Sequence, residues 1–305
     1  MNFSVVIPVY DGAETIGALV QRLGQVLPTI AEAFEVILVN DGSRDRSWET
    51  ITKLVERYAW VVGINLMRNY GQHNALLCGI RAARYEITIT MDDDLQHPPE
   101  EIPKLLTKMK QNYDVVYGVP HHRQHPWWRI LFAALTKRAV AWVMGIPSVQ
   151  DIGSYRAFRT DIRRAFEHFH GSDVLVDVLL SWGTNRFASV TVEEDSRMVG
   201  KSNYNFITLV RVSLLVLTSY TTAPLRFASI IGFLFTLFGV GVLIYVLTIY
   251  FTVGSIPGFP FLASTIIIFS GVQLFALGII GEYLARVFER TGGRPTYTIA
   301  RVIEK

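Results

Sequence analysis

Residues 87–96 read Ile-Thr-Ile-Thr-Met-Asp-Asp-Asp-Leu-Gln, an apolar run that ends in three adjacent acids. The β-branched residues of this run and its short length predict a short strand inside a sheet. Three neighbouring carboxylates repel one another unless solvent or a cation screens them. A solvated acidic loop is the alternative, but at the end of an inner strand a hard divalent cation, Mg²⁺ or Mn²⁺, explains the cluster better. With Gln96 beside it, the cluster predicts a metal site that bridges to a diphosphate.

Apolar strand patterns and amphipathic helix patterns alternate over about the first 120 residues. Strands are predicted at 4–9, 35–40, 61–66, 87–91 and 115–117, and helices at 14–26, 47–58, 74–83 and 99–110. Asp45 is the expected N-cap of the second helix. Strict alternation predicts an α/β fold with a Rossmann-like, mostly parallel sheet that is covered on both faces.

Polar residues follow four of the predicted strands. Ligands of such sheets bind outside the carboxyl ends of the strands, so these residues are expected to form one binding rim. They are Tyr10 and Asp11, then Asp41, Gly42 and Ser43, then Arg68, Asn69 and Tyr70, and finally Asp92, Asp93 and Asp94.

The second half of the chain contains a long uncharged stretch. No Asp, Glu, Lys or Arg occurs between Arg226 and Glu282, although residues 1–200 carry charges throughout. About 20 apolar residues suffice for one membrane span, so this stretch accommodates two, with a turn in the Gly- and Pro-rich segment 254–260. A buried hairpin in a soluble core is the alternative, but soluble helices rarely lack charges on every face.

The flanking charges predict how the protein lies in a membrane. Arginines precede the first span and follow the second, whereas the connecting turn has none, so the head and both termini are expected in the cytoplasm at the cell (inner) membrane. The single cysteine, Cys78, fits a reducing compartment, and the net charge of +3 is too small to imply a nucleic-acid partner. The expected parts are a head (1–200), a juxtamembrane amphipathic helix (201–224), two transmembrane helices (225–290) and a cytoplasmic tail (291–305). A further amphipathic segment, 127–143, either lies in the headgroup region or packs on the sheet.

Six short motifs, in this order, carry a family resemblance. They are Val5-Val-Ile-Pro-Val-Tyr10, Asn40-Asp-Gly-Ser43 with Asp45, Arg68-Asn-Tyr-Gly-Gln-His73, Asp92 to Gln96 with Pro98 and Pro99, Asp151 to Arg156, and Gly200 to Tyr204. Together they resemble the family 2 glycosyltransferases of GT-A fold, and among them the enzymes that glycosylate polyprenyl phosphates. The sequence departs from many of these relatives at Asn40, where they carry Asp, and at Asp11-Gly12.

The resemblance implies roles for individual residues. Asp92 and Asp94 match the Asp-x-Asp metal and diphosphate motif, with Gln96 as a further ligand. Four residues would hold the nucleoside: Pro8, Tyr10, Asp11 and Asp41. Four cations would bind phosphate groups: Arg197, Lys201, Arg123 and Arg129; contact with lipid headgroups is the alternative for the first two. Asp151 would be the general base, or would orient Arg156 instead.

The expected reaction is an inverting in-line transfer of a hexose, with glucose as the first choice, from a UDP-sugar to undecaprenyl or another polyprenyl phosphate. The acceptor phosphate is mostly dianionic at neutral pH, so it needs orientation more than deprotonation. UDP-linked aminoarabinose and GDP-mannose are alternative donors. A processive polysaccharide synthase is a weaker alternative, because the chain lacks the Gln-x-x-Arg-Trp motif; a membrane scaffold or channel is the remotest. Small residues in the two spans favour a homo-oligomer.

Overall fold

The computed structural model describes residues 1–120, 153–171, 174–195, 222–254, 258–293 and 295–305. The chain divides into two compact units. The first, which we call the head, comprises Met1–Val210 and Gly293–Lys305. The second, the hairpin, comprises Arg211–Gly292.

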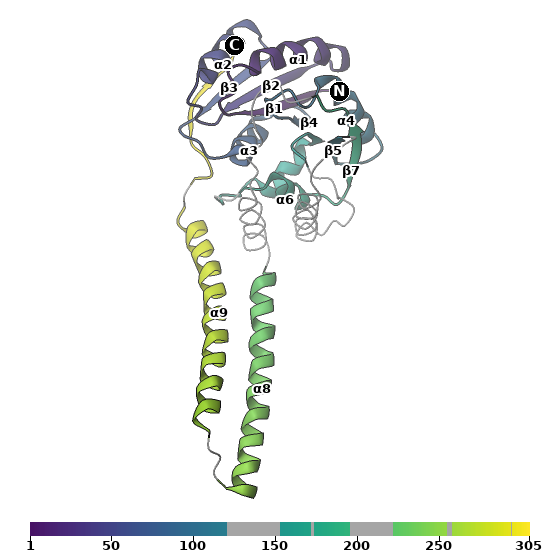
Figure 1. Ribbon diagram of the computed structural model, residues 1–305. Helices are drawn as coiled ribbons and strands as arrows, with labels where there is room; N and C mark the ends of the chain where they lie inside the picture. The colour runs from purple at the N-terminus through teal and green to yellow at the C-terminus, as the bar shows by residue number, and fades with distance from the viewer. Residues whose placement is uncertain (121–152, 172–173, 196–221, 255–257, 294) are drawn as a thin grey trace. The chain divides into compact units, whose positions relative to one another are not determined.

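The head is built on a sheet in which eight strands are described, in the order β7-β5-β6-β4-β1-β2-β3-β8. Strands β1 to β5 and β7 are labelled in Figure 1. Their bounds are β1 Phe3–Val9, β2 Phe34–Asn40, β3 Val61–Leu66, β4 Ile87–Thr90, β5 Val115–Pro120, β6 Arg156–Arg159, β7 Phe187–Val192 and β8 Ile299–Ile303. Strand β1 pairs in parallel with β2 and β4, β2 with β3, and β5 with β7. Strands β6 and β8 run antiparallel to their neighbours. The mostly parallel α/β sheet predicted from the sequence is therefore confirmed, with two antiparallel additions.

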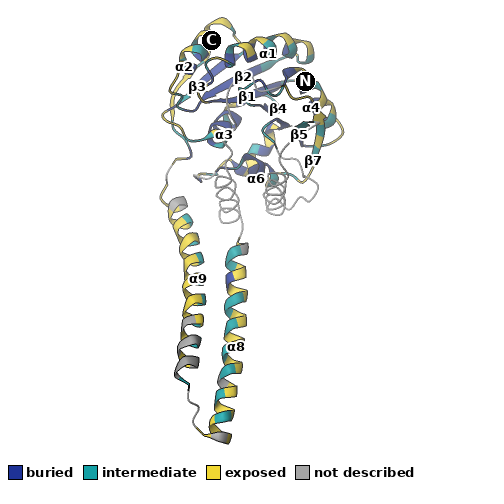
Figure 2. Ribbon diagram, in the orientation of Figure 1, coloured by how far each residue is buried: buried dark blue, intermediate teal, exposed yellow. Residues whose placement is uncertain are grey.

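Helices cover both faces of this sheet. They are α1 Ile16–Ile30, α2 Ser47–Arg57, α3 Gln72–Ala82, α4 Ile102–Met109 after the short turn η1 Pro99–Glu101, η2 Thr160–Phe166 and α6 Val176–Ser181. Alternate residues of β1, such as Val5 and Ile7, belong to a buried apolar cluster with residues of α1, α2 and α4. The intervening Val6 faces α3, where a Cβ on Gly79 would lie 2.3 Å from Val6 Cγ1. Period-two alternation thus supplies two apolar faces from one strand, and every residue of β1 is buried, as its dark blue ribbon in Figure 2 shows.

The C-terminal residues differ from expectation. The segment expected as a tail, 291–305, contains β8, which pairs antiparallel with β3 and forms one edge of the sheet. Ile299 and Val302 on this strand remain exposed, so its pattern is that of a surface segment although its backbone is paired.

The hairpin consists of α8 Ala223–Val253 and α9 Phe259–Thr291. Each contains a stretch long and apolar enough to cross a membrane, Pro224–Thr252 with a mean hydropathy of 2.6 and Ile268–Phe288 with 1.6. Helix α8 ends at Gly254, whose φ of 93° suits glycine, and α9 begins with Pro260 in its first turn. Within the hairpin, Gly239 accommodates the ring of Phe269, because a Cβ there would lie 2.9 Å from the ring.

Candidate active site

The carboxyl ends of β1, β2 and β4 lie at one edge of the sheet because these strands are parallel neighbours. The loops after β1 and β2 are bonded to each other. The Asp11 N–H donates to Ser43 Oγ at 3.1 Å, and Asp11 Oδ1 accepts from the Arg44 N–H at 2.7 Å. Tyr10, between Val9 and this turn, is 44% exposed at the rim. The structure thus brings Tyr10 and Asp11 together with the β2 loop, as predicted.

Asp41 organises the neighbouring loop between β3 and α3. Its two carboxylate oxygens accept the backbone N–H groups of Tyr70 at 2.7 Å and Gly71 at 2.8 Å. Burial raises the pKa of Asp41 despite these two hydrogen bonds. Gly42 (φ 64°) lies against the same loop, where a Cβ would come within 2.4 Å of the backbone of Arg68. The Asp41 carboxylate therefore holds the loop between β3 and α3 in place beside the rim.

The acidic loop after β4 is anchored by its apolar member. Leu95 has a φ of 61°, which is unusual for a non-glycine residue, and its side chain is buried in the core. This anchoring holds Asp94 and Gln96 at the rim on either side of Leu95, and the Gln96 N–H donates to Asp94 Oδ1 at 3.1 Å. A left-handed conformation at a leucine is unfavourable by itself, so the burial of the Leu95 side chain holds the loop in this shape.

Asp92 is held on both carboxylate oxygens by side chains from other segments. Gln72 Nε2, at the start of α3, donates to Asp92 Oδ1 at 2.6 Å, and Ser154 Oγ, just before β6, donates to Asp92 Oδ2 at 2.6 Å. The pKa of Asp92 is raised, chiefly by burial, with a further contribution from the charge of Asp94. Neither Gln72 nor Ser154 was singled out from the sequence as a site residue, although both fall within the motif segments.

Asp93 points towards the β1 loop. A Cβ on Gly12 would lie 2.2 Å from Asp93 Oδ2, and that oxygen is buried with no hydrogen-bond partner among the described residues. Burial, followed by the charges of Asp92 and Asp94, raises the pKa of Asp93 to about 7. Position 12 therefore requires glycine, because any side chain there would collide with Asp93. The acidic loop also carries buried negative charge that solvent does not screen.

These residues are suited to hold a divalent cation whose remaining ligands come from the substrate. Among the described residues no three His, Cys, Asp or Glu side chains form a ready ligand cluster. Mg²⁺ and similar ions are commonly held by one or two carboxylates together with water and substrate phosphate oxygens, so Asp92, Asp94 and Gln96 offer a suitable donor set. Burial first, and the charges of neighbouring acids second, raise the pKa values of Asp92 and Asp93, and a bound cation would stabilise their ionised forms.

A buried polar network lies behind the acidic loop. Arg156, 1% exposed, forms an ion pair with Asp177, and its Nε donates to Thr90 Oγ1 at 3.0 Å. Thr90 Oγ1 in turn donates to the Ser154 carbonyl at 2.7 Å, and Tyr117 OH donates to Asp177 at 2.9 Å. Arg156 was considered as a partner of Asp151; its partner among the described residues is Asp177 on α6.

The remaining predicted site residues divide into two groups. Pro8 is buried within β1, one residue before the strand ends. Five residues lie outside the described part of the chain: Asp151, Arg123, Arg129, Arg197 and Lys201. The nearest described neighbour of Arg197, two residues before it, is Asp195, whose N–H donates to the Gln96 carbonyl at 2.9 Å.

A mostly parallel sheet with an acidic loop and polar strand ends at one rim is the arrangement in which open α/β sheets bind their ligands. The chain belongs to glycosyl transferase family 2, whose model matches residues 4–164. It is a glycosyltransferase, as the resemblance of its motifs implied.

Relatives match the chain over nearly its whole length. An undecaprenyl-phosphate 4-deoxy-4-formamido-L-arabinose transferase of Enterobacter sp. (strain 638) is 34% identical, and the match covers 99% of this chain and 94% of the relative. The same enzyme of Pseudomonas paraeruginosa (strain DSM 24068 / PA7) is 35% identical, over 98% and 90% of the two chains. Glucose, the first choice from the sequence, finds no support in these names. The motifs that carry the family resemblance are shared by relatives that use different donors, so they could not decide the sugar.

Among solved structures, the fold is similar to that of glucosyl-3-phosphoglycerate synthase from Mycobacterium tuberculosis in complex with Mn²⁺, uridine diphosphate and glucosyl-3-phosphoglycerate. The TM-score is 0.51 at 17% identity, and the match covers 71% of this chain and 77% of the other. A mycobacterial protein gives a TM-score of 0.52 at 19% identity, over 71% and 72% of the two chains. At such identities the likeness concerns the fold, and it confirms a GT-A type head.

Proposed function

We propose that this enzyme transfers 4-deoxy-4-formamido-L-arabinose from a UDP carrier to undecaprenyl phosphate. The observation that carries the proposal is the 34% identity to a transferase of that name over 99% of this chain, so the match includes the head and the apolar hairpin together. A soluble acceptor would give an enzyme no use for two helices of this kind. A lipid phosphate at the bilayer surface explains both parts.

The rim supports binding of a nucleoside diphosphate. Tyr10 offers an exposed ring beside the β2 loop for the base, and the acidic loop after β4 lies at the end of a neighbouring strand. A divalent ion, Mg²⁺ or Mn²⁺, held by Asp92, Asp94 and Gln96 would supply positive charge to the departing diphosphate. The solved Mycobacterium tuberculosis neighbour contains Mn²⁺ and UDP, which supports this proposal for a related fold.

The reaction is a single displacement. A phosphate oxygen of the lipid attacks the anomeric carbon as the bond from that carbon to the UDP oxygen breaks, so the configuration inverts and UDP leaves. The nucleophile is already anionic, so alignment of two anions is the main requirement. Asp151 would orient the acceptor or take the last proton from its phosphate. Phosphate contacts are assigned to Arg123, Arg129, Arg197 and Lys201.

The hairpin would place this chemistry at a membrane. With arginines on both flanks and none in the connecting turn, the head and both termini would lie on the cytoplasmic side of the cell membrane. Glycines in both helices would allow close approach within one chain or between copies, and a homo-oligomer is included in the proposal.

The test is a transfer assay with a panel of donors. Full-length protein in detergent is incubated with Mn²⁺, undecaprenyl phosphate and one radiolabelled donor at a time: UDP-4-deoxy-4-formamido-L-arabinose, UDP-glucose or GDP-mannose. Label should enter the lipid fraction with the first donor at a rate at least about tenfold above the others. Labelling with another donor only would refute the sugar assignment, and no labelled lipid from folded protein would refute the activity.

A processive polysaccharide synthase is the second candidate, favoured by membership of the same family. Its product would grow by many sugars on one acceptor. Mass spectrometry of the lipid product separates the two, because the proposed enzyme adds one sugar only.

A further inference from the structure

Asp92 is held on both of its carboxylate oxygens by side chains from other segments. Gln72 Nε2 and Ser154 Oγ each donate to a different carboxylate oxygen, both at 2.6 Å. The two donors come from segments 20 and 62 residues away in the sequence. A carboxylate bonded on both oxygens has its plane fixed, which matters for a group that must present a lone pair in one direction.

The Gln72 donor is fixed by the helix that it begins. At this end of α3, Asp41 accepts the N–H groups of Tyr70 and Gly71, the two residues before Gln72. In the middle of α3, Gly79 lies so close to β1 that an added Cβ would be 2.3 Å from Val6. The start of the helix therefore has little freedom to shift along or away from the sheet.

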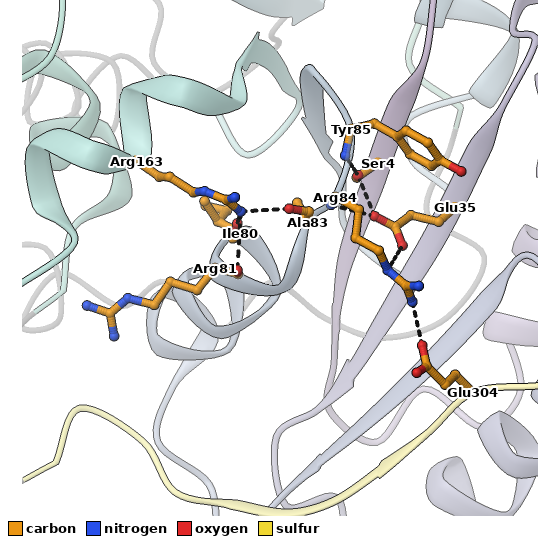
Figure 3. Close-up of polar contacts among 9 residues, drawn as sticks. All are labelled: Ser4, Glu35, Ile80, Arg81, Ala83, Arg84, Tyr85, Arg163 and Glu304. Carbon is orange, nitrogen blue, oxygen red and sulfur yellow. Dashed lines mark hydrogen bonds and ion pairs between the residues drawn. The ribbon is translucent and has the colours of Figure 1, made fainter.

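The far end of α3 is held by charged groups (Figure 3). Arg163 Nη1 donates to the carbonyl oxygens of Ile80, Arg81 and Ala83, at 3.3, 3.2 and 2.6 Å, and so satisfies carbonyls that a helix end leaves unpaired. Just beyond, the Arg84 N–H donates to Glu35 Oε1 at 2.7 Å, which ties the segment after α3 to the start of β2. Gln72 thus extends from a helix that is fixed along its length.

The Ser154 donor is fixed by the buried network. Its carbonyl accepts from Thr90 Oγ1, which itself accepts from the Arg156 guanidinium. Arg156 is paired with Asp177. The position of Ser154 is therefore set by three groups, Thr90, Arg156 and Asp177, and the last two are charged and buried.

We propose that Gln72 and Ser154 are positioning residues that together orient the Asp92 carboxylate for a divalent cation at the donor site; this rests on the metal site of the proposed function. Both donors are neutral. A lysine or arginine in either place would orient the carboxylate but would also repel the incoming cation, whereas an amide and a hydroxyl fix its direction and leave its charge to the metal. The clamp, defined as Gln72, Asp92 and Ser154, joins the loops after β3 and β4 to the segment that precedes β6.

The experiment measures metal binding directly. Isothermal titration of Mn²⁺ into full-length protein saturated with UDP is performed for the unaltered chain and for Gln72→Met, Ser154→Ala and Ser154→Thr. Gln72→Met and Ser154→Ala should each raise the Mn²⁺ dissociation constant about 10- to 100-fold. Ser154→Thr retains a hydroxyl and should stay within about threefold. Matched controls are Gln21→Met, on the exposed face of α1, and Ser181→Ala, whose hydroxyl donates to the Val178 carbonyl within α6.

The outcomes separate two failures. If the unaltered chain binds Mn²⁺ with UDP and the two clamp variants bind it equally well, the clamp is refuted while the metal site stands. If the unaltered chain binds no Mn²⁺, the metal site itself is refuted, and the clamp with it. Thermal unfolding of each variant shows whether a weakened site reflects loss of fold; weaker binding at an unchanged unfolding midpoint, with recovery in Ser154→Thr, supports the clamp.

Discussion

Acidic residues have different surroundings at the two ends of the strands in the head sheet. We call the side where the parallel strands begin the amino edge and the side where they end the carboxyl edge. At the amino edge, Glu35 at the start of β2 accepts from Ser4 Oγ and the Arg84 N–H at 2.7 Å each, and pairs with the Arg84 guanidinium at 3.1 Å. At the carboxyl edge, Asp93 has a buried oxygen without a partner among the described residues, and burial first, then neighbouring acids, raise its pKa to about 7.

Asp114 extends the contrast. It precedes β5 at the amino edge, and its pKa is lowered: burial acts to raise it, but hydrogen bonds from Arg186 and Thr184 outweigh that effect. An acid that the protein supplies with cations stabilises the fold, whereas buried acids with raised pKa values, gathered at one end of a sheet, are typical of a functional site. We therefore assign a structural role to the amino edge and propose a functional role for the carboxyl edge.

Exchange of one carboxylate for an amide at the functional edge should have the largest effect. Asp94→Asn is expected to lower kcat/KM for sugar transfer about 1000-fold, because a metal ligand contributes several kcal/mol of charge stabilisation to the transition state. The thermal unfolding midpoint should fall little, or rise, since one of three repelling charges is removed. Initial rates with labelled donor and undecaprenyl phosphate provide the measurement; a loss below about tenfold would remove Asp94 from the metal site.

The opposite pattern is expected at the structural edge. Glu35→Ala leaves the Ser4 hydroxyl and the Arg84 N–H without their acceptor and should lower the free energy of unfolding by about 2 kcal/mol. Activity per folded molecule should be unchanged. Urea denaturation followed by tryptophan fluorescence measures the first quantity, with the exposed Glu32→Ala as the control. Equal stability of the two variants would contradict the structural role of this edge.

Stability should depend on pH in opposite directions at the two edges, because the pKa of Asp93 is raised and that of Asp114 is lowered. The folded-state pKa of Asp93 lies above its unfolded value of 3.8, so between these values the folded protein binds more protons and this residue lowers stability as the pH rises. In EDTA, the stability of Asp93→Asn relative to the unaltered chain should therefore rise from about pH 4 to about pH 7 and level off above that. Thermal midpoints across this range test the sign. A difference that stays constant with pH would show that Asp93 does not titrate there.

The smallest effect is expected where an ion pair is exposed. Glu304, just after β8, pairs with Arg84, and both side chains are more than half exposed. Glu304→Gln should lower the free energy of unfolding by no more than about 0.5 kcal/mol, and less in high salt. A loss as large as that of Glu35→Ala would mean that the C-terminal residues are a main support of the amino edge.

Local pattern was sufficient for the first half of the head. The five predicted strands match β1 to β5 within a few residues, because each is largely buried and consists mainly of apolar or β-branched residues. Asp45 was expected to cap α2, and its carboxylate does accept the Ser47 N–H at 2.9 Å, although the residue directly before the helix is Arg46.

Elements that depend on distant partners were missed. Strand β6 reads Arg-Ala-Phe-Arg, a sequence that suggests a surface, but Asp177 on α6 pairs with Arg156 and makes its burial possible. Strand β8 is short and follows the apolar hairpin, and its partner β3 precedes it by more than 200 residues. Gln72 and Ser154 were missed for the same reason, since their role becomes visible only when three loops meet at Asp92.

The central claim is that the donor diphosphate binds through a divalent cation at the carboxyl edge. The most direct measurement is an anomalous difference map from crystals of the full chain grown with Mn²⁺ and UDP. A strong peak is expected within coordination distance of Asp94, with UDP phosphate oxygens as further ligands and Gln72 and Ser154 still bonded to Asp92. A UDP molecule bound elsewhere on the head, or bound at this edge without a metal peak, would contradict it.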